Sequence, residues 1–562
     1  MSARTVPAVP GDAGAVPDRP GTGDGARPRA VVVGGGIAGL ASAALLAREG
    51  YEVDLLEQND ELGGRAGSWE SGGFRFDTGP SWYLMPEVFD HFFELLGTSA
   101  AEQLDLSVLD PGYRVFFEDG SAPLDIRADR AANIATFESV ETGAGRRLEA
   151  YLASARQAYD LAVRRFLYTT FASPRSLLHR DVLVRAPRLA ELLLRPLGSF
   201  VAARFQDPRL RQVLGYPAVF LGSSPDRAPS MYHLMSHMDI ADAVRYPQGG
   251  FTRLIEVVAA LAVREGARLH TGATVTAILT GAVPERVARR RGLSAAARRA
   301  GVRAGARGVR YRTADGAEHT VRAEVVVAAA DLHHVETQLL PEPLRTYPQR
   351  WWDRRTSGPG AVLLYLGVRG SLPELPHHSL FFTTDWQSNF DAIFGRSPRV
   401  PEPASSYVCK PSQTDPTVAP PGTENVFVLV PVPADVTLGR GGVDGAGDPA
   451  VERIADAAID QIAAWADIGD LRERVVVRRT VGPADFAAEL NAWSGGVLGP
   501  AHTLRQSAFL RGSNASRRVA GLYYAGSSTI PGIGLPMCLI SAEIMLKRLR
   551  HDHSTEPLAV PL

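Results

Sequence analysis

A glycine-rich segment at residues 29–65 constrains the fold of this chain more than any other part of its sequence. Four apolar residues, Ala30–Val33, predict a short buried strand, and the sequence Gly-Gly-Gly-Ile-Ala-Gly follows directly as residues 34–39. An Ala- and Leu-rich helix comes next, and then a second predicted strand at Glu52–Leu56 that ends on Glu57. A strand, Gly-x-Gly-x-x-Gly, a helix, a strand and an acid in this order are typical of a dinucleotide-binding site.

Each glycine of this segment has a physical role in such a site. Gly34 permits the tight turn, Gly36 lets the backbone approach a pyrophosphate at the helix N-terminus, and Gly39 lets the helix pack closely on the strand. Glu57 lies 21 residues after Gly36, where its carboxylate can accept hydrogen bonds from an adenosine ribose. The predicted cofactor contacts of this segment are Gly34, Gly36, Ile37, Ala38, Gly39 and Glu57.

A second glycine turn, Gly63-Gly64-Arg65, follows soon after the acid. Domains that bind only nicotinamide dinucleotides do not need such a turn. A turn that carries an arginine suits a cofactor with a long pyrophosphate and a bulky second ring, which indicates FAD. The alternative is an ordinary surface turn. We therefore add Gly64 and Arg65 to the predicted cofactor contacts.

Composition excludes several classes of protein. At 562 residues, with 45% hydrophobic and 22% charged residues, the chain is expected to fold into two or more domains. A net charge of −1 gives no general attraction to nucleic acid, and nothing resembles a nucleic-acid module. Two distant cysteines, Cys409 and Cys538, predict neither a metal site nor a disulfide framework, so a cytoplasmic location is expected. Residues 1–28 have no apolar core typical of a signal peptide and are expected to be a disordered tail.

The C-terminal part of the sequence predicts an opposite wall for the same cofactor. A strand at residues 521–526 ends on Gly526, the loop Pro531–Pro536 contains no bulky polar residue, and Met537–Arg550 reads as a helix. A helix N-terminus approached by glycines can present backbone N–H groups to an anionic ring; the alternative is a simple docking helix. Residues 519–542 carry no charge, but their glycines and prolines argue against a transmembrane helix. The further predicted cofactor contacts are Gly79, Pro80 and Ser81, in a Gly-Pro loop near residue 80, and Gly526, Gly534, Pro536 and Met537.

Residues 131–214 follow a helical pattern, and residues 151–215 hold 11 Arg and only 4 acidic residues, interleaved with large apolar residues. Basic helices with apolar faces can lie on an anionic bilayer, and a helical lobe with a solvated arginine face is the equal alternative. Residues 282–308, rich in Arg, Ala and Gly, are expected to form a flexible loop within a β-meander, and residues 389–421 to be rich in loops.

Four stretches together resemble the bacterial-type phytoene desaturases, the FAD-dependent carotenoid desaturases. They are residues 29–65, the loop Phe76–Ser81, the strand Val325–Asp331 and the closing stretch Leu490–Leu546. The most specific sequences are Leu-Asn-Ala-Trp at 490–493, Leu-Arg-Gln-Ser-Ala-Phe at 504–509, and residues 522–543. The chain departs from the family at 512–515, where Pro-His-Asn-Arg is frequent, and at 526–529, where Gly-Ala-Gly-Thr is frequent.

The resemblance implies an α/β fold with α+β inserts. Its core would be a discontinuous Rossmann-like FAD-binding domain of the monoamine-oxidase and glutathione-reductase type, with a substrate domain and a helical membrane-facing lobe. The FAD domain would comprise residues 29–105, 245–335 and 505–553, and the substrate domain residues 106–244, which include the basic lobe, and 336–504; residues 554–562 would be a tail. Such enzymes bind membranes peripherally, which here implies the inner face of the cell membrane.

The activity that the resemblance implies is desaturation of phytoene, up to lycopene, with a hydride passing to flavin N5 and a proton lost from the neighbouring carbon. The substrate would be a hydrophobic polyene, and oxygen or a quinone would accept the electrons. Asp181 and Arg185 lie in a stretch that resembles a polar segment of the family's substrate cavity and are the catalytic candidates. The alternatives are a C30 desaturase, a carotenoid isomerase, a desaturase of lycopene ends, a prenyl-binding escort protein and an amine oxidase.

Overall fold

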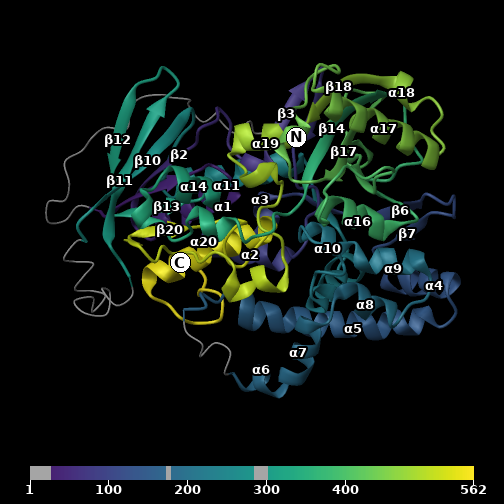
Figure 1. The fold of residues 1–562 in the computed structure, drawn as a ribbon, viewed down its shortest axis with the longest axis horizontal. Coiled ribbons are helices and arrows are strands. Elements are labelled where there is room, and N and C mark those ends of the chain that lie inside the picture. Colours follow the sequence, from purple (N-terminus) through teal and green to yellow (C-terminus); the bar gives the residue numbers. More distant parts are fainter. Residues whose placement is uncertain (1–26, 173–178, 284–300) are drawn as a thin grey trace.

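A parallel five-stranded sheet brings together the beginning, the middle and the end of the chain (Figure 1). The computed structural model describes residues 27–172, 179–283 and 301–562. The strands lie in the order β20 (Leu522–Tyr524), β13 (Val325–Ala328), β1 (Arg29–Val33), β2 (Glu52–Leu56) and β9 (Arg268–His270). Every neighbouring pair is parallel, and Val32 stands opposite both Val327 and Leu55. The sheet is therefore assembled from segments as far as about 490 residues apart in sequence.

Alternate residues of β1 face two different layers, as expected for a buried central strand. Ala30 and Val32 pack with α1 (Ile37–Arg48), α2 (Pro86–Leu95), α11 (Gly250–Arg264) and α20 (Leu535–Arg550). Val31 and Val33 pack with α14 (Leu332–Gln338) and with the antiparallel strands β10 (Ala273–Gly281), β11 (Ala304–Thr313) and β12 (Glu318–Arg322). β19 (Val519–Ala520) pairs with β11. The carboxyl end of β1, where the glycine turn begins, is thus held between a helical layer and a β layer.

The prediction that residues 282–308 form a loop is wrong for the C-terminal end of this range. β11 begins at Ala304, and Gly305 pairs with Gly281 of β10. Residues 284–300 lie outside the described part of the chain. The start of this strand is built from small residues, with Ala304 and Ala306 buried and Gly308 in the left-handed region against β12. Such a strand has no large apolar residues at alternate positions, so periodicity does not reveal it.

A seven-stranded sheet forms the second large unit. Its order is β18 (Val475–Val481), β14 (Gly360–Arg369), β17 (Thr423–Val432), β16 (Ser406–Cys409), β15 (His378–Phe382), β6 (Tyr113–Phe117) and β7 (Leu124–Ile126). Only the pair β15 and β6 is parallel. Residues 389–421 are less loop-rich than predicted, because α16 (Trp386–Phe394) extends into them and β16 lies within them. β16 has only four residues and lies between Pro403 and Pro411, which hides it from a pattern search.

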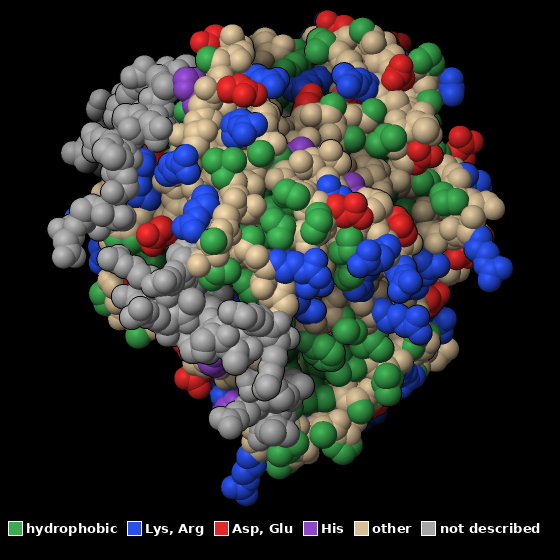
Figure 2. Space-filling model, turned by 60° about the vertical axis from the view of Figure 1, so that its left-hand side comes forward, with side chains coloured by type: hydrophobic (Ala, Val, Ile, Leu, Met, Phe, Trp, Pro, Cys, Tyr) green, Lys and Arg blue, Asp and Glu red, His purple; other side chains and the backbone are tan. Residues whose placement is uncertain are grey.

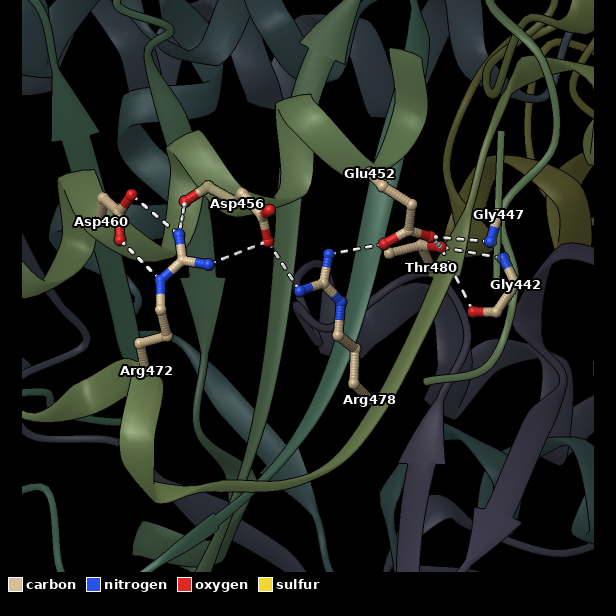
Figure 3. A network of polar contacts seen from close by, with 8 residues as sticks. All are labelled: Gly442, Gly447, Glu452, Asp456, Asp460, Arg472, Arg478 and Thr480. Atoms are coloured by element: carbon tan, nitrogen blue, oxygen red, sulfur yellow. Dashed lines mark hydrogen bonds and ion pairs between the residues drawn. The ribbon is translucent and has the colours of Figure 1, made fainter. Parts of the chain in front are cut away.

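One face of this sheet is covered by α17 (Pro449–Trp465), which α18 (Leu471–Arg474) follows. A network of charged side chains ties these elements together (Figure 3). Arg478 of β18 donates to Glu452 at 2.5 Å and to Asp456 at 2.7 Å, both on α17. Arg472 of α18 donates to both carboxylate oxygens of Asp460, at 3.0 and 2.8 Å. The other face is turned toward the hairpin β3 (Ser68–Ser71) and β4 (Phe74–Asp77), which leads to the predicted cofactor loop.

The predicted helical region forms a lobe beneath this sheet (Figure 1). Its helices are α4 (Arg130–Val140), α5 (Ala144–Ala162), α6 (Arg180–Val184), α7 (Ala186–Leu194), α8 (Leu197–Ala202), α9 (Pro208–Gly215) and α10 (Pro217–Phe220). Their core is shared with residues of β6, β7 and β15. In the three described ranges, none of the helices has both the length and the apolar character needed to cross a bilayer.

Candidate functional site

The two glycine turns predicted to hold a dinucleotide lie directly against each other. The Gly63 N–H donates to the carbonyl oxygen of Gly35 at 3.0 Å, and Gly36 and Gly63 form a β-bridge. A Cβ atom at Gly64 would lie 3.3 Å from the Cα of Gly36. Gly63-Gly64-Arg65 is therefore part of one continuous backbone wall at the N-terminus of α1 and not an isolated surface turn.

The space around each fingerprint glycine differs in a way that locates the ligand. A Cβ at Gly39 would overlap the carbonyl oxygen of Gly34, so helix and turn are in backbone contact there. Gly34 has φ +102°, which favours glycine, and its Cβ would meet the Ala330 backbone at 3.0 Å. At Gly36 the nearest atom to a Cβ would be the Gly63 oxygen, 3.8 Å away. Gly36 is thus the least crowded of these three glycines, and it lies at the N-terminus of α1, where a pyrophosphate fits.

Glu57 lies where the sequence predicts, at the end of β2, and is buried. Its Oε2 accepts from the Gly35 N–H at 2.6 Å, and its Oε1 accepts from the Asn59 N–H at 2.9 Å. A carboxylate offers about four acceptor positions, so two remain for the hydroxyl groups of a ribose. The two backbone bonds also fix the orientation of the carboxylate relative to the glycine turn.

Arg65 has two buried donor atoms that form no hydrogen bond with any described residue. Its Nε and Nη2 are buried and have no hydrogen-bond partner among the described residues. Nη2 lies 3.7 Å from Oδ2 of Asp331 in an ion pair. Buried donors without acceptors cost free energy, and a diphosphate supplies several charged acceptors. The orphaned guanidinium and the uncrowded backbone at Gly36 both fit the predicted dinucleotide.

The loop that follows β4 packs on the same arginine. A Cβ at Gly79 would overlap the carbonyl oxygen of Arg65, and the Thr78 N–H donates to the carbonyl of Gly67 at 2.9 Å. Pro80 and Ser81 continue this loop, and Ser81 is buried. The structure therefore places Gly79, Pro80 and Ser81 next to the second glycine turn, as the sequence predicts.

Asp331 is a site residue that the sequence analysis did not select. Its Oδ1 accepts from the backbone N–H groups of His333 and His334, so it caps α14, and its Oδ2 faces Arg65. The available signal was an aspartate three residues after a buried strand, since aspartate is a favoured N-cap. Asp331 therefore orients Arg65 through a helix cap.

The C-terminal segment meets the fingerprint from the other side. A Cβ at Gly526 would lie 3.8 Å from the Cβ of Ala38, and the Gly526 N–H donates to Oγ of Ser541 on α20 at 3.0 Å. Gly534, with φ +117°, is the N-cap of α20; Pro536 and Met537 lie in its first turn. Ile37 and Ala38, both buried, begin the helix against which α20 packs. Gly526 and α20 thus lie against the start of α1, and the cofactor contacts predicted at Gly534, Pro536 and Met537 stay a prediction.

A buried arginine near the start of α20 adds positive charge to this site. Arg511 donates Nε and Nη2 to the carbonyl of Ser527, at 3.2 and 2.6 Å, and Nη1 to the carbonyl of Gln506. No carboxylate among the described residues pairs with it. Burial lowers the pKa of Arg511 to about 10, so it remains a cation at neutral pH. Its positive charge and the N-terminus of α20 both favour an anionic ligand.

His502 supports the loop before α20. The Ile533 N–H donates to Nε2 of His502 at 3.3 Å, and Nδ1 lies 2.7 Å from the hydroxyl of Tyr232. Burial holds the pKa of His502 well below its usual range, so the imidazole is neutral. Because Nε2 accepts, Nδ1 carries the proton and donates it to Tyr232. No local sequence pattern predicts this pairing, since 270 residues separate the two side chains.

Trp82 directly follows the cofactor loop and is the centre of an aromatic cluster. Ring centroids lie 4.7 Å away for His378, 5.3 Å for Tyr113, 5.4 Å for Phe220, 6.2 Å for Tyr216 and 6.3 Å for Tyr407. The hydroxyls of Tyr113 and Tyr216 donate to Oδ2 of Asp239, at 3.1 and 2.6 Å. Oδ1 of Asp239 is buried without a partner in the described structure, and burial raises the pKa of Asp239 to about 6. Asp239 is therefore a half-satisfied carboxyl group bonded to two of the rings that contact Trp82.

Asp181 and Arg185, the predicted catalytic residues, lie elsewhere. They are on and beside α6, at the lower edge of the lobe in Figure 1, away from α1 and β1. Asp181 accepts from Nε of Arg165 at 2.8 Å, and Arg185 is exposed. No hydrogen bond or ion pair between described residues joins them to the glycine turns. Their catalytic role stays a prediction.

Comparison with known proteins agrees with this geometry. Residues 37–544 match the family model described as flavin containing amine oxidoreductase. The chain is 40% identical over 521 residues to a carotenoid 3,4-desaturase of Haloarcula japonica, covering 93% of this chain and 98% of the relative. It is 34% identical to a zeta-carotene-forming phytoene desaturase of Myxococcus xanthus, covering 93% of each chain. The structure of wild-type putrescine oxidase bound to putrescine matches with a TM-score of 0.55 and 15% identity, over 94% of this chain and 99% of that one. The predicted fold is confirmed by these likenesses.

Proposed function

The chain belongs to the flavin-containing amine oxidoreductase family and is an FAD-dependent oxidoreductase, and we propose that it desaturates carotenoids. The observation that carries the proposal is the pairing of a complete dinucleotide cradle with an aromatic cluster that begins at the next residue of the cofactor loop, Trp82. FAD supplies the hydride acceptor of such a reaction. The protein must then exclude water, hold an apolar chain and accept one proton.

Aromatic side chains suit this reaction for two reasons. Removal of a hydride next to a double bond leaves positive charge on the carbon chain, and the faces of aromatic rings stabilise a cation. The same rings exclude water from the reacting bond. Trp82, Tyr216, Phe220 and Tyr407 offer such faces close to the cofactor loop.

Asp239 is the group that we propose as proton acceptor. Its free Oδ1, its burial and its pKa of about 6 support this role, because at neutral pH it is ionised and can take a proton. Asp181 is the competing candidate, kept from the family resemblance. Substitution Asp239→Asn should lower turnover at least about 100-fold, the lower end of general-base effects, while Asp181→Asn should not. The opposite ranking would assign the role to Asp181.

Within carotenoids, we propose the 3,4 bond near the end of an already conjugated chain as the preferred substrate. The 40% identity to a carotenoid 3,4-desaturase supports this choice. The competing substrate is phytoene, which is supported by the 34% identity to a phytoene desaturase. The decisive experiment supplies the purified yellow protein with phytoene or with lycopene in separate assays and separates the products by chromatography. Lycopene consumed with a product two hydrogens lighter and absorbing at longer wavelength supports 3,4-desaturation. Phytoene consumed instead would assign the earlier reaction, and consumption of neither would refute carotenoid desaturation.

We further propose that the helical lobe binds the inner face of the cell membrane. α6 and α7 expose the apolar side chains Leu183, Val184, Leu193 and Leu194. A surface pocket beside them is lined by Arg165, His179, Arg180, Asp181, Val184 and Arg185, so cations outnumber acids there. Figure 2 shows hydrophobic side chains gathered in a hollow on the lower part of one face, with Lys and Arg side chains above them. Apolar side chains beside arginines favour an anionic bilayer.

The membrane proposal is tested by sedimentation with phosphatidylglycerol vesicles. Leu194 is 73% exposed, and Leu194→Glu should weaken binding about 10- to 150-fold, as expected when a leucine no longer enters the bilayer. Val476→Glu is the matched control, since Val476 is 49% exposed but lies on β18, in the opposite unit. Equal effects of both substitutions, or none, would contradict a binding face on α7.

The electron acceptor, oxygen or a quinone, is identified by which of the two reoxidises the reduced protein.

A further inference from the structure

Three buried side chains to which the proposed desaturation assigns no hydride or proton transfer meet where β15 begins and β16 ends. His378 begins β15, His377 precedes it, and Cys409 ends β16, with His378 and Cys409 paired in register. Their exposed fractions are 2% for His377, 0% for His378 and 4% for Cys409. One potential ligand atom from each lies within 4.8 Å of the other two. Two histidines and one cysteine are a donor set that zinc-like ions prefer.

Both histidines have one nitrogen in use and one free. Nδ1 of His377 lies 2.8 Å from Oγ1 of Thr414, and Nδ1 of His378 lies 2.9 Å from the hydroxyl of Tyr407. Both Nε2 atoms are buried and have no partner among the described residues. In metal sites one ring nitrogen of a histidine typically binds the ion while the other donates to an outer partner, which sets the tautomer. Thr414 and Tyr407 are placed as such partners.

The surrounding charges are compatible with a bound cation. Lys410, which follows Cys409, is buried, and its Nζ donates to the Leu372 carbonyl at 2.6 Å and lies 3.8 Å from Glu424. Asp415 contributes a negative charge that acts on His377, and it accepts from the Gly249 N–H at 2.7 Å. Lys410 is therefore held by its own acceptors, and the site as a whole is not surrounded by excess positive charge.

We propose that His377, His378 and Cys409 bind one divalent ion of the zinc class through two imidazole nitrogens and a thiolate. With bonds of about 2.0–2.1 Å to nitrogen and about 2.3 Å to sulfur, tetrahedral ligand atoms of this set lie roughly 3.3–3.6 Å apart. Since the ligand atoms lie within 4.8 Å of one another, no pair has to approach by more than about 1.5 Å, and the fourth position is left for water. Binding releases the thiol proton to solvent. Because Trp82 stacks on His378, with a centroid distance of 4.7 Å and an interplanar angle of 12°, the ion would anchor the residue that follows the cofactor loop.

The test is titration of chelator-treated, flavin-loaded protein with Co²⁺, followed by gel filtration and metal analysis. We expect one ion per chain, thiolate-to-cobalt charge-transfer absorption, and ligand-field bands at wavelengths beyond those where oxidised flavin absorbs. Cys409→Ser should remove the charge-transfer band. It should also weaken Co²⁺ binding by more than about 100-fold, because loss of a hydrogen-bond partner outside the ligand set already weakens metal binding about 10- to 100-fold. Cys538→Ser, which changes the other cysteine of the chain, should leave both readouts as in the wild type.

Two further variants decide the question even where Cys409→Ser does not fold. Thr414→Val removes only the outer partner of His377 and should weaken Co²⁺ binding about 10- to 100-fold with flavin content unchanged. His378→Gln should abolish stoichiometric binding. Absence of stoichiometric Co²⁺ and Zn²⁺ binding by the folded wild-type protein overturns the proposal. So does a Co²⁺ complex that survives either His378→Gln or Cys409→Ser, because the ion then binds elsewhere.

Discussion

Two neighbouring glycines of the fingerprint should respond oppositely to the same substitution. A Cβ at Gly36 would make only an ordinary contact, 3.8 Å from the Gly63 carbonyl oxygen, whereas a Cβ at Gly39 would overlap the carbonyl oxygen of Gly34. Gly36→Ala should therefore weaken FAD binding and leave the apoprotein folded. Gly39→Ala should destabilise the fold itself.

The magnitudes follow from the local geometry. Gly36 has φ −70° and ψ 172°, which alanine adopts without strain, so Gly36→Ala should change the unfolding free energy of the apoprotein by no more than about 1 kcal/mol, and in the stabilising direction. In the holoprotein the new methyl group competes with the pyrophosphate, and an overpacking cost of about 1–3 kcal/mol weakens FAD binding about 5- to 150-fold. At Gly39 the helix must move away from the turn, so the unfolding free energy should fall by about 3 kcal/mol or more.

The assay combines FAD titration of each apoprotein, followed by flavin fluorescence, with urea unfolding of the same samples. Ala38→Gly is a useful control, because Ala38 lies between Gly36 and Gly39. The substitution lowers the helix propensity of this segment without adding atoms to the cradle, so it separates loss of helix stability from steric overlap. Wild-type FAD affinity in Gly36→Ala would refute the placement of the pyrophosphate at this turn. Wild-type stability in Gly39→Ala would refute the backbone contact between helix and turn.

Three other substitutions test separate parts of the structure. Arg65→Met should weaken FAD binding about 10- to 150-fold, because charge-assisted hydrogen bonds of about 1.5–3 kcal/mol are lost, and fluorescence titration measures this. Asp239 has a pKa of about 6 in the folded protein against 3.8 when unfolded. Its contribution to the unfolding free energy is therefore fully present below about pH 4 and falls by about 3 kcal/mol as the pH rises through 6. Urea unfolding at several pH values should show this decrease in the wild type and not in Asp239→Asn. Arg478→Met should lower the unfolding free energy by about 1.5–3 kcal/mol, because Arg478 is only 19% exposed. Arg472 is 47% exposed, and Arg472→Met should lower it by less than about 1 kcal/mol. Equal losses in urea unfolding would contradict the argument that burial strengthens the Arg478 ion pairs.

The cofactor half of the site could be predicted because its determinants are local. Turn glycines, a capping position and an acid after a strand act within a few residues of one another, so their spacing alone indicates what they hold. Glu57 illustrates this: its position after β2 predicted the carboxylate, and the structure adds only the bonds to Gly35 and Asn59. The C-terminal wall was predictable for the same reason, since the glycines before α20 leave a helix N-terminus uncovered.

The remaining part of the site depends on contacts between distant segments. Trp82 reaches its surroundings only when β6, β15 and the helical lobe have assembled, and Asp239 is paired with Tyr113, 126 residues away. Buried polar residues of this kind carry no periodic signal, since a single aspartate in a short π-helical turn looks like a surface residue. The short strand β16 is hidden in the same way, and with it the juxtaposition of Cys409 and the two histidines.

The two halves meet at one loop, and this has a consequence for how substrate preference can change. Gly79 packs on Arg65 of the second glycine turn, whereas Trp82, three residues later, contacts Tyr216 and rings of β6, α10, β15 and β16. Substitutions in Tyr216 or Phe220 can therefore reshape the aromatic cluster without touching the glycine cradle, because neither residue contacts the fingerprint through any described hydrogen bond. One glycine cradle can thus serve relatives named for the desaturation of different carotenoids, and we expect substrate specificity to map to the rings around Trp82 and not to the glycine turns.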